Sequence, residues 1–252
     1  MVHISLSAEK IVELFGFPIT NTLLTSWLVM AFLILGAYML SRRLAVLPAG
    51  SQNFSEMAID GLLNFMTTIA GNRKDAERFF PIVATIFIFV LLANWAGILP
   101  GVGSIGFYEE AIREEHGEAQ RTFVPFFRSV NSDLNMTLAL ALIAVTLSHY
   151  FGVGALGAFR HAGKFFNFRN PINFFVGLLE FISEFAKIIS FSFRLFGNVF
   201  AGEVLLVIIT FLAPVIAPVP FYGLELFVGF IQALIFAVLT MMFLVVATKH
   251  QY

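Results

Sequence analysis

Ionisable and polar side chains recur at helical spacing in the most apolar third of the chain. Glu180, Lys187 and Arg194 are spaced seven residues apart, so an α-helix carries them on nearly one face. The residues close to the same stripe are Ser183, Glu184, Ser190 and Asn198. Carboxylates can gain and lose protons, whereas arginine stays cationic. The stripe therefore combines proton-carrying groups with a fixed positive charge, the residue types that a proton path would need.

Three further polar residues lie outside this stripe. Glu203 is nine residues beyond Arg194 and therefore points to the opposite side of the same helix. Glu225 and Gln232 are again seven residues apart and share a face of the following segment. A charged group in hydrocarbon costs roughly 2.5 to 3.5 kcal/mol, so several of them imply partners, water or function. If Glu203 and Glu225 meet, we expect them to titrate as one coupled unit.

Static explanations are also open for part of this pattern. Lys187 could extend to a membrane interface, and Glu180 with Lys187 could form a structural ion pair. Arg194 has no carboxylate three or four residues away to neutralise it locally. His149 lies near the end of another apolar run, where we expect it to pack between helices.

The composition indicates that membrane helices must hold these residues. Of 252 residues, 59% are hydrophobic and 12% are charged, whereas soluble domains average about 25% charged. The net charge of −1 gives no basic excess for binding nucleic acid. The chain has no cysteine, and it carries no metalloprotease, hydrolase or nucleotide-binding motif in a fitting context. We therefore expect no cofactor, no metal and no catalytic activity of its own.

Charge-free runs divide the chain into membrane spans. We predict upright spans at 22–41, 79–100 and 134–155, each about the 20 residues that cross a bilayer. Residues 51–71 are different, because apolar residues recur at helical spacing with charged residues largely on the other side. This pattern predicts an amphipathic helix in the membrane surface.

Lysine and arginine predict the orientation. Nine of them flank one side of the spans and four flank the other, and the richer side is cytoplasmic as a rule. We therefore expect the N-terminal segment 1–21 and the acidic loop 101–132 outside, and the C-terminus in the cytoplasm. The whole chain, 1–252, is expected to form one membrane domain.

The last third of the chain predicts a long helical hairpin. Residues 171–212 have no internal proline after the first position, and Pro214, Pro218 and Pro220 are expected to stop any helix after them. This gives a helix of about 60 Å for about 30 Å of hydrocarbon. Either the helix breaks near Gly177 or Gly197, or it is strongly tilted and 221–248 returns beside it. The tilted hairpin is the favoured interpretation. The predicted fold class is all-α and polytopic, with about five membrane-embedded helices and one surface helix.

Three stretches carry a family resemblance: EFISEFAKIISFSFRLFGNVFAGE, LFVGFIQALIFAVLT and NSDLNMTLALAL. They resemble subunit a of the F-type ATP synthase, the membrane stator that faces the rotating ring of c subunits. The resemblance covers nearly the whole chain in the same order. It implies that Arg194 separates two offset aqueous half-channels and attracts the ionised carboxylate of a passing c subunit. Other matching positions are Asn198 and Gln232 near the arginine, Glu203 and Glu225 in the outer half-channel, and Glu180, Ser183 and Lys187 towards the cytoplasmic side.

The resemblance also implies partners and a location. The partners are the c-subunit ring, b-type peripheral stalk subunits and the F1 catalytic sector, in a bacterial inner membrane or alternatively a mitochondrial one. Many family members have a histidine at one of the positions of Glu203 and Glu225. This chain has glutamate at both, which argues against a simple imidazole relay here. Two other functions fit the residues. A proton-coupled secondary transporter would be favoured by inverted repeats, and a non-conducting scaffold would use the charges as static pairs.

Overall fold

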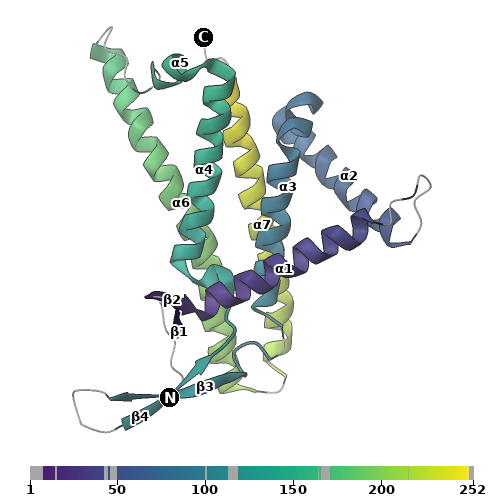
Figure 1. The fold of residues 1–252 in the computed structure, drawn as a ribbon, viewed down its shortest axis with the longest axis vertical. Coiled ribbons are helices and arrows are strands. Elements are labelled where there is room, and N and C mark those ends of the chain that lie inside the picture. The colour runs from purple at the N-terminus through teal and green to yellow at the C-terminus, as the bar shows by residue number, and fades with distance from the viewer. Residues whose placement is uncertain are drawn as a thin grey trace. The chain divides into compact units, whose positions relative to one another are not determined.

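The computed structural model describes residues 8–14, 16–42, 45, 50–99, 101–112, 119–163, 165, 171–214 and 216–249. Parts of the predicted external segments, residues 1–7 and 113–118, lie outside the described residues. Within the described part, the helices are α1 (Asn21–Ser41), α2 (Ser51–Ala70), α3 (Arg73–Ala96), α4 (Leu134–Leu156), α5 (Ala158–Gly163), α6 (Pro171–Leu212) and α7 (Pro218–Thr248) (Figure 1). Five of them, α1, α3, α4, α6 and α7, are long and apolar enough to cross a membrane. The predicted all-α membrane fold is confirmed.

Two β-hairpins and a short turn complete the described elements. Strands β1 (Lys10–Leu14) and β2 (Phe17–Thr20) pair antiparallel, as do β3 (Gly106–Ile112) and β4 (Ala119–Pro125) (Figure 1). A turn of 3₁₀ helix, η1 (Val130–Ser132), follows β4. The sequence predicts these segments only as regions outside the membrane, because the charge pattern identifies such regions but does not predict their secondary structure. In the second hairpin the rings of Tyr108 and Phe123 pack edge to face across the strands, 5.4 Å apart.

Helix ends follow local backbone chemistry. The first residues of α6 and α7 are Pro171 and Pro218, where a missing N–H costs nothing because the first turn has no helical acceptor for it. Pro218 and Pro220, which the sequence predicts as helix stops, both stand in the first turn of α7. Helix α2 ends at Ala70, and its C-cap residue Gly71 has φ 78° and donates its N–H to the Thr67 carbonyl. Glycine tolerates this left-handed conformation without strain.

Helix α6 is one continuous element of 42 residues. The alternative of a break near Gly177 or Gly197 is therefore wrong, and the bounds are those expected from the prolines. At 1.5 Å per residue the helix is about 63 Å long. Its tilt against a membrane stays a prediction.

The chain divides into two compact units. Unit 1 comprises Met1–Ala37, Phe89–Met136 and Phe196–Gln232, and unit 2 comprises Tyr38–Ile88, Thr137–Leu195 and Ala233–Tyr252. Unit 2 has an apolar core of large side chains from α2, α3 and α7, including Met66, Phe79, Val83, Met241 and Leu244. Unit 1 buries many polar side chains instead, among them Asn21, Thr22, Asn94, Asn131 and Asp133. Buried polar groups are costly unless they are hydrogen-bonded. The hydrogen-bonded polar groups of unit 1 are therefore candidates for a functional role.

Candidate functional site

Glu203 forms an ion pair with an arginine that the sequence analysis did not single out. Arg128 Nε lies 3.1 Å from Glu203 Oε1, and Nη2 lies 3.5 Å from Oε2, so two guanidinium donors face the two carboxylate oxygens. The Arg128 side chain is 7% exposed and that of Glu203 is 33% exposed. The backbone N–H of Arg128 donates to Thr25 Oγ1 of α1. The pair therefore ties α6 to the segment that follows β4.

Glu225 lies against α6 at Gly202, the residue before Glu203. A Cβ added at Gly202 would overlap the Glu225 carboxylate, so only glycine lets that carboxylate rest on the backbone of α6 next to Glu203. Glu225 is 7% exposed. The turn between α6 and α7 thus places the Glu225 carboxylate against Gly202, the sequence neighbour of Glu203. The titration of the two glutamates as one unit stays a prediction.

The two predicted amide residues are hydrogen-bonded to each other. Asn198 Nδ2 donates to Gln232 Oε1 at 2.6 Å. Gln232 is buried, whereas Asn198 is exposed on α6. This bond is a second polar link between α6 and α7 in unit 1. Asn198 lies about one helical turn before Gly202, so the Asn198–Gln232 bond and the Glu225 contact follow one another along α6.

A buried amide network also holds α7 in unit 1. Asn94 Nδ2 donates to the Gly229 carbonyl at 2.9 Å, and Asn131 Nδ2 donates to Asn94 Oδ1 at 2.7 Å. Trp95 Nε1 donates to the Leu226 carbonyl at 3.1 Å. These bonds attach α3 to the turn of α7 that follows Glu225. They hold in place the helix that carries the buried Glu225 carboxylate, because a hydrogen-bonded polar network makes the positions of its members more rigid.

Arg194 contrasts with Arg128. It is exposed on α6 and forms no ion pair with any residue that the structure describes. Because α6 is continuous, Ser190, Gly197 and Ala201 share its face at spacings of four, three and seven residues. All three are exposed. The guanidinium therefore stands on a face where small side chains leave room for another chain to approach closely.

Arg194 lies in unit 2, as do the remaining predicted residues. Glu180 is exposed, while Ser183 and Lys187 are half-buried. The Glu180–Lys187 pair weighed in the sequence analysis does not form in the described structure, because Lys187 Nζ bonds Glu184 Oε1 at 2.7 Å instead. The three-residue spacing of Glu184 and Lys187 was the signal for this pair.

His149 packs between helices and has polar partners at both ring nitrogens. Its Nδ1 lies 3.0 Å from His161 Nε2, and its Nε2 lies 3.5 Å from Glu184 Oε2. No spacing in the sequence connects these three residues, since they come from α4, α5 and α6. Arg128 was similarly hidden, because a basic residue just before a predicted span is usually a flanking charge.

Buried and half-buried ionisable groups on membrane-length helices define a class of protein. Such groups in membrane segments face a bundle interior or a partner, and they mark ion and proton pathways. The chain is thus a polytopic helical membrane protein whose helices carry ionisable groups of the kind that ion pathways use.

The comparisons identify the family. A family model described as ATP synthase A chain matches residues 23–245. Three relatives named ATP synthase subunit a come from Campylobacter jejuni (34% identical over 224 residues, 88% of this chain and 87% of the relative), Desulfotalea psychrophila (35% over 233 residues, 90% and 84%) and Gloeobacter violaceus (37% over 225 residues, 87% and 80%). The chain belongs to the ATP synthase A chain family, whose work is ATP synthesis and proton transport in a membrane.

Proposed function

We propose that the chain is the proton-translocating stator subunit of the membrane sector of a rotary ATP synthase. It forms two half-channels against a ring of c subunits and couples proton flow to ATP synthesis. It catalyses no reaction itself, because synthesis belongs to the F1 catalytic sector, to which b-type peripheral stalk subunits connect it. We assign it to a bacterial inner membrane, with the N-terminus outside and the C-terminus in the cytoplasm, on the distribution of lysine and arginine.

The observation that carries this proposal is the exposed, unpaired Arg194 among small residues. A cation in hydrocarbon costs about 2.5 to 3.5 kcal/mol or more, and the described chain supplies no carboxylate to offset that cost. A carboxylate on another chain would supply it. Exposed Gly197 and Ala201 on the same face allow the backbone of such a partner helix to come close.

A fixed cation suits a moving partner. Arginine cannot release its proton, so it repels a proton that would cross directly and attracts each ionised carboxylate that passes. It can separate two half-channels while the ring turns between them. A lysine would carry the charge but lack the planar fork of donors.

The glutamates of unit 1 supply the outer half-channel in this proposal. Glu225 is buried next to Glu203, and Glu203 is partly exposed and ion-paired with Arg128. A proton can therefore pass from an accessible carboxylate to a buried one. Asn198 and Gln232 give hydrogen-bonding groups further along α6. The residues Glu180, Ser183 and Lys187 belong to the inner half-channel.

The experiment measures ATP-driven acidification of inverted membrane vesicles. Glu203→Gln and Glu225→Gln should each slow acidification strongly, and the double variant should lose little more than the worse single one, because coupled residues give non-additive losses. Glu77→Gln is the control, since Glu77 forms an exposed ion pair with Arg73 on α3. Losses that simply multiply would place the two glutamates at separate points of the path. Unchanged acidification in all variants would overturn the proposal.

A further inference from the structure

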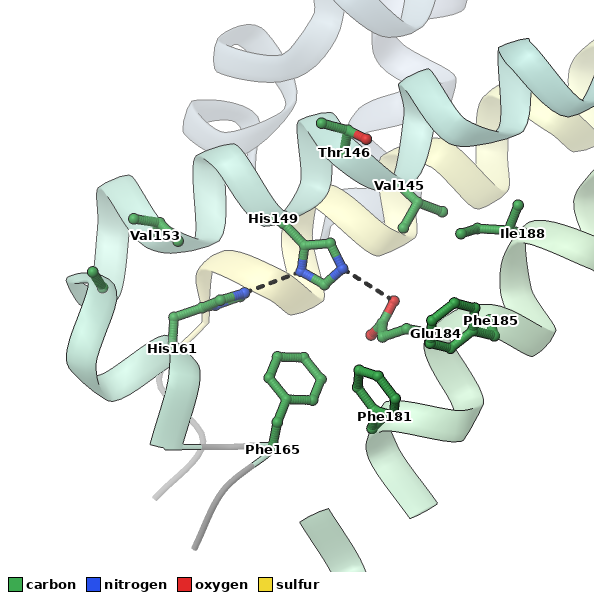
Figure 2. A pocket seen from close by; sticks show the side chains of 11 residues that line it. Val145, Thr146, His149, Val153, His161, Phe165, Phe181, Glu184, Phe185 and Ile188 are labelled. Atoms are coloured by element: carbon green, nitrogen blue, oxygen red, sulfur yellow. Dashed lines mark hydrogen bonds and ion pairs between the residues drawn. The ribbon is translucent and has the colours of Figure 1, made fainter. Parts of the chain in front are cut away.

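A chain of ionisable contacts in unit 2 lies outside the residues assigned above. Figure 2 shows His149 of α4 between His161 of α5 and Glu184 of α6. One ring nitrogen of His149 lies 3.0 Å from His161 Nε2, and the other lies 3.5 Å from Glu184 Oε2. An imidazole can bind a proton on one nitrogen and release one from the other. The middle residue of this chain therefore has both of its nitrogens engaged by groups that can themselves carry protons.

The same three side chains line a recess of about 450 Å³ (Figure 2). The rest of its lining is mostly apolar, with rings of Phe165, Phe181 and Phe185. The polar atoms that water could bind are concentrated at the two histidines and the glutamate.

Local packing holds His161 in this arrangement. It is 7% exposed, and a Cβ added at Gly152 of α4 would come within 2.7 Å of its Cε1 atom. The His161 ring therefore rests on the backbone of α4, one turn from His149. A ring held this closely keeps its Nε2 facing the His149 Nδ1.

We propose that Glu184, His149 and His161 form a proton relay between the polar stripe of α6 and the recess. This inference rests on the proposed function and adds residues to its inner half-channel. A protonated Glu184 gives its proton to His149 Nε2, while the His149 Nδ1–H bond breaks and that proton binds His161 Nε2. Glu184 is left as a carboxylate, His149 as the other neutral tautomer and His161 as imidazolium. Because His161 Nδ1 is buried, the imidazolium releases its Nε2 proton to water in the recess. Water in the recess takes the proton from His149 Nε2 and returns one to Nδ1, which restores the first tautomer, and the reverse sequence carries protons the other way.

Charged groups around the relay come from several helices. Lys187 bonds Glu184 on α6 and lies 5.3 Å from the ring centroid of Phe243 of α7. From α3, Arg78 lies over the ring of Phe151, two residues from His149. Lys187 shares the Glu184 carboxylate with His149, each contacting a different oxygen. The lysine therefore offers the carboxylate a cation whenever its proton has moved to His149.

The test uses intact ATP synthase in inverted vesicles and the initial rate of ATP-driven acidification. A side chain that transfers protons typically contributes about 10²- to 10⁴-fold, and because water can replace part of that, we expect a loss of about tenfold for His149→Gln and for His161→Gln. His149→Ala should lose as much and recover when imidazole is added, because the recess can admit the free base. Pyrazole has the same shape but is far less basic, so it should not restore the rate.

The controls separate a relay from a structural role and from failure of the proposed function. Tyr150→Phe removes an exposed titratable group beside His149 on α4 and should pump at the wild-type rate. Equal rescue by imidazole and pyrazole, or wild-type pumping by both glutamine variants, would overturn the relay. If His149→Ala fails to assemble, the assembled glutamine variants decide. Absence of acidification in wild-type vesicles would instead overturn the proposed function, whatever the histidines do.

Discussion

Replacing Gly202 by alanine perturbs the candidate site at a single point. A methyl group there would overlap the carboxylate of Glu225. Because Glu225 is buried at the contact of α6 and α7, its carboxylate must swing away from the neighbourhood of Glu203. The substitution removes no ionisable group and no hydrogen-bond donor, so any change in proton flux reports the position of the Glu225 carboxylate.

Two opposing effects keep the stability change small. Alanine is favoured over glycine inside a helix by about 0.8 to 1 kcal/mol, whereas overpacking a buried site costs about 1 to 3 kcal/mol. The overlapping atoms stand at the end of a flexible side chain, which favours the lower part of that range. We therefore expect a net destabilisation of about 0 to 2 kcal/mol and nearly normal assembly. Proton flux should fall about 10- to 100-fold, because misplacing a reacting group by about 1 Å can cost 10²-fold.

The assay is again ATP-driven acidification of inverted vesicles, normalised to the amount of this chain in the membrane. Gly223→Ala is the matched control. Gly223 also lies in a helix, close to Glu225 in sequence, and a Cβ there meets no described atom within 4 Å. It should pump at the wild-type rate. Wild-type flux in an assembled Gly202→Ala complex would refute the need for Glu225 beside Glu203, and an equal loss in Gly223→Ala would trace the effect to the helix.

Two further predictions concern the ion pair and the topology. Arg128→Gln should lower the free energy of unfolding by about 2 kcal/mol. Loss of an exposed ion pair costs about 0 to 1 kcal/mol and breaking a buried one costs about 3 to 5 kcal/mol, and this pair lies between the two because Glu203 is partly exposed. Thermal unfolding of the detergent-solubilised complex measures this, and Arg128→Gln combined with Glu203→Gln should cost less than the sum of the two; strict additivity would contradict the pairing. Since the chain has no native cysteine, Tyr108→Cys should react with an impermeant thiol reagent from outside intact cells and Arg160→Cys only in inverted vesicles. The reverse labelling would overturn the orientation.

The helices were predictable because simple physical limits govern them. The charge-free run at 22–41 needs only the thickness of a bilayer to be recognised, and 171–212 is bounded by proline at its start. The hairpins β1–β2 and β3–β4 were not predictable in this way, because their strands are short and hydropathy rules describe only what leaves the membrane. The sequence predicts that Pro218 ends a helix, but a proline backbone suits the first turn of a helix equally well, and Pro218 begins α7.

The candidate site was predictable where one helix carries it. Glu180, Lys187 and Arg194 follow from a seven-residue spacing on α6. Partners from other elements could not be found by spacing. Arg128 reaches Glu203 from a distant part of the chain, and His149 meets its two partners only once three helices are folded.

The most direct measurement of the central claim is ATP-driven acidification by a complex that carries Arg194→Ala. The complex should assemble and hydrolyse ATP, because Arg194 forms no ion pair within the described chain, yet the vesicles should not acidify, because no fixed cation meets the passing carboxylate. Arg194→Lys should restore little of the activity, since lysine lacks the planar fork of donors. Normal acidification by assembled Arg194→Ala would contradict the account, and loss of assembly would show that Arg194 acts as a scaffold residue instead.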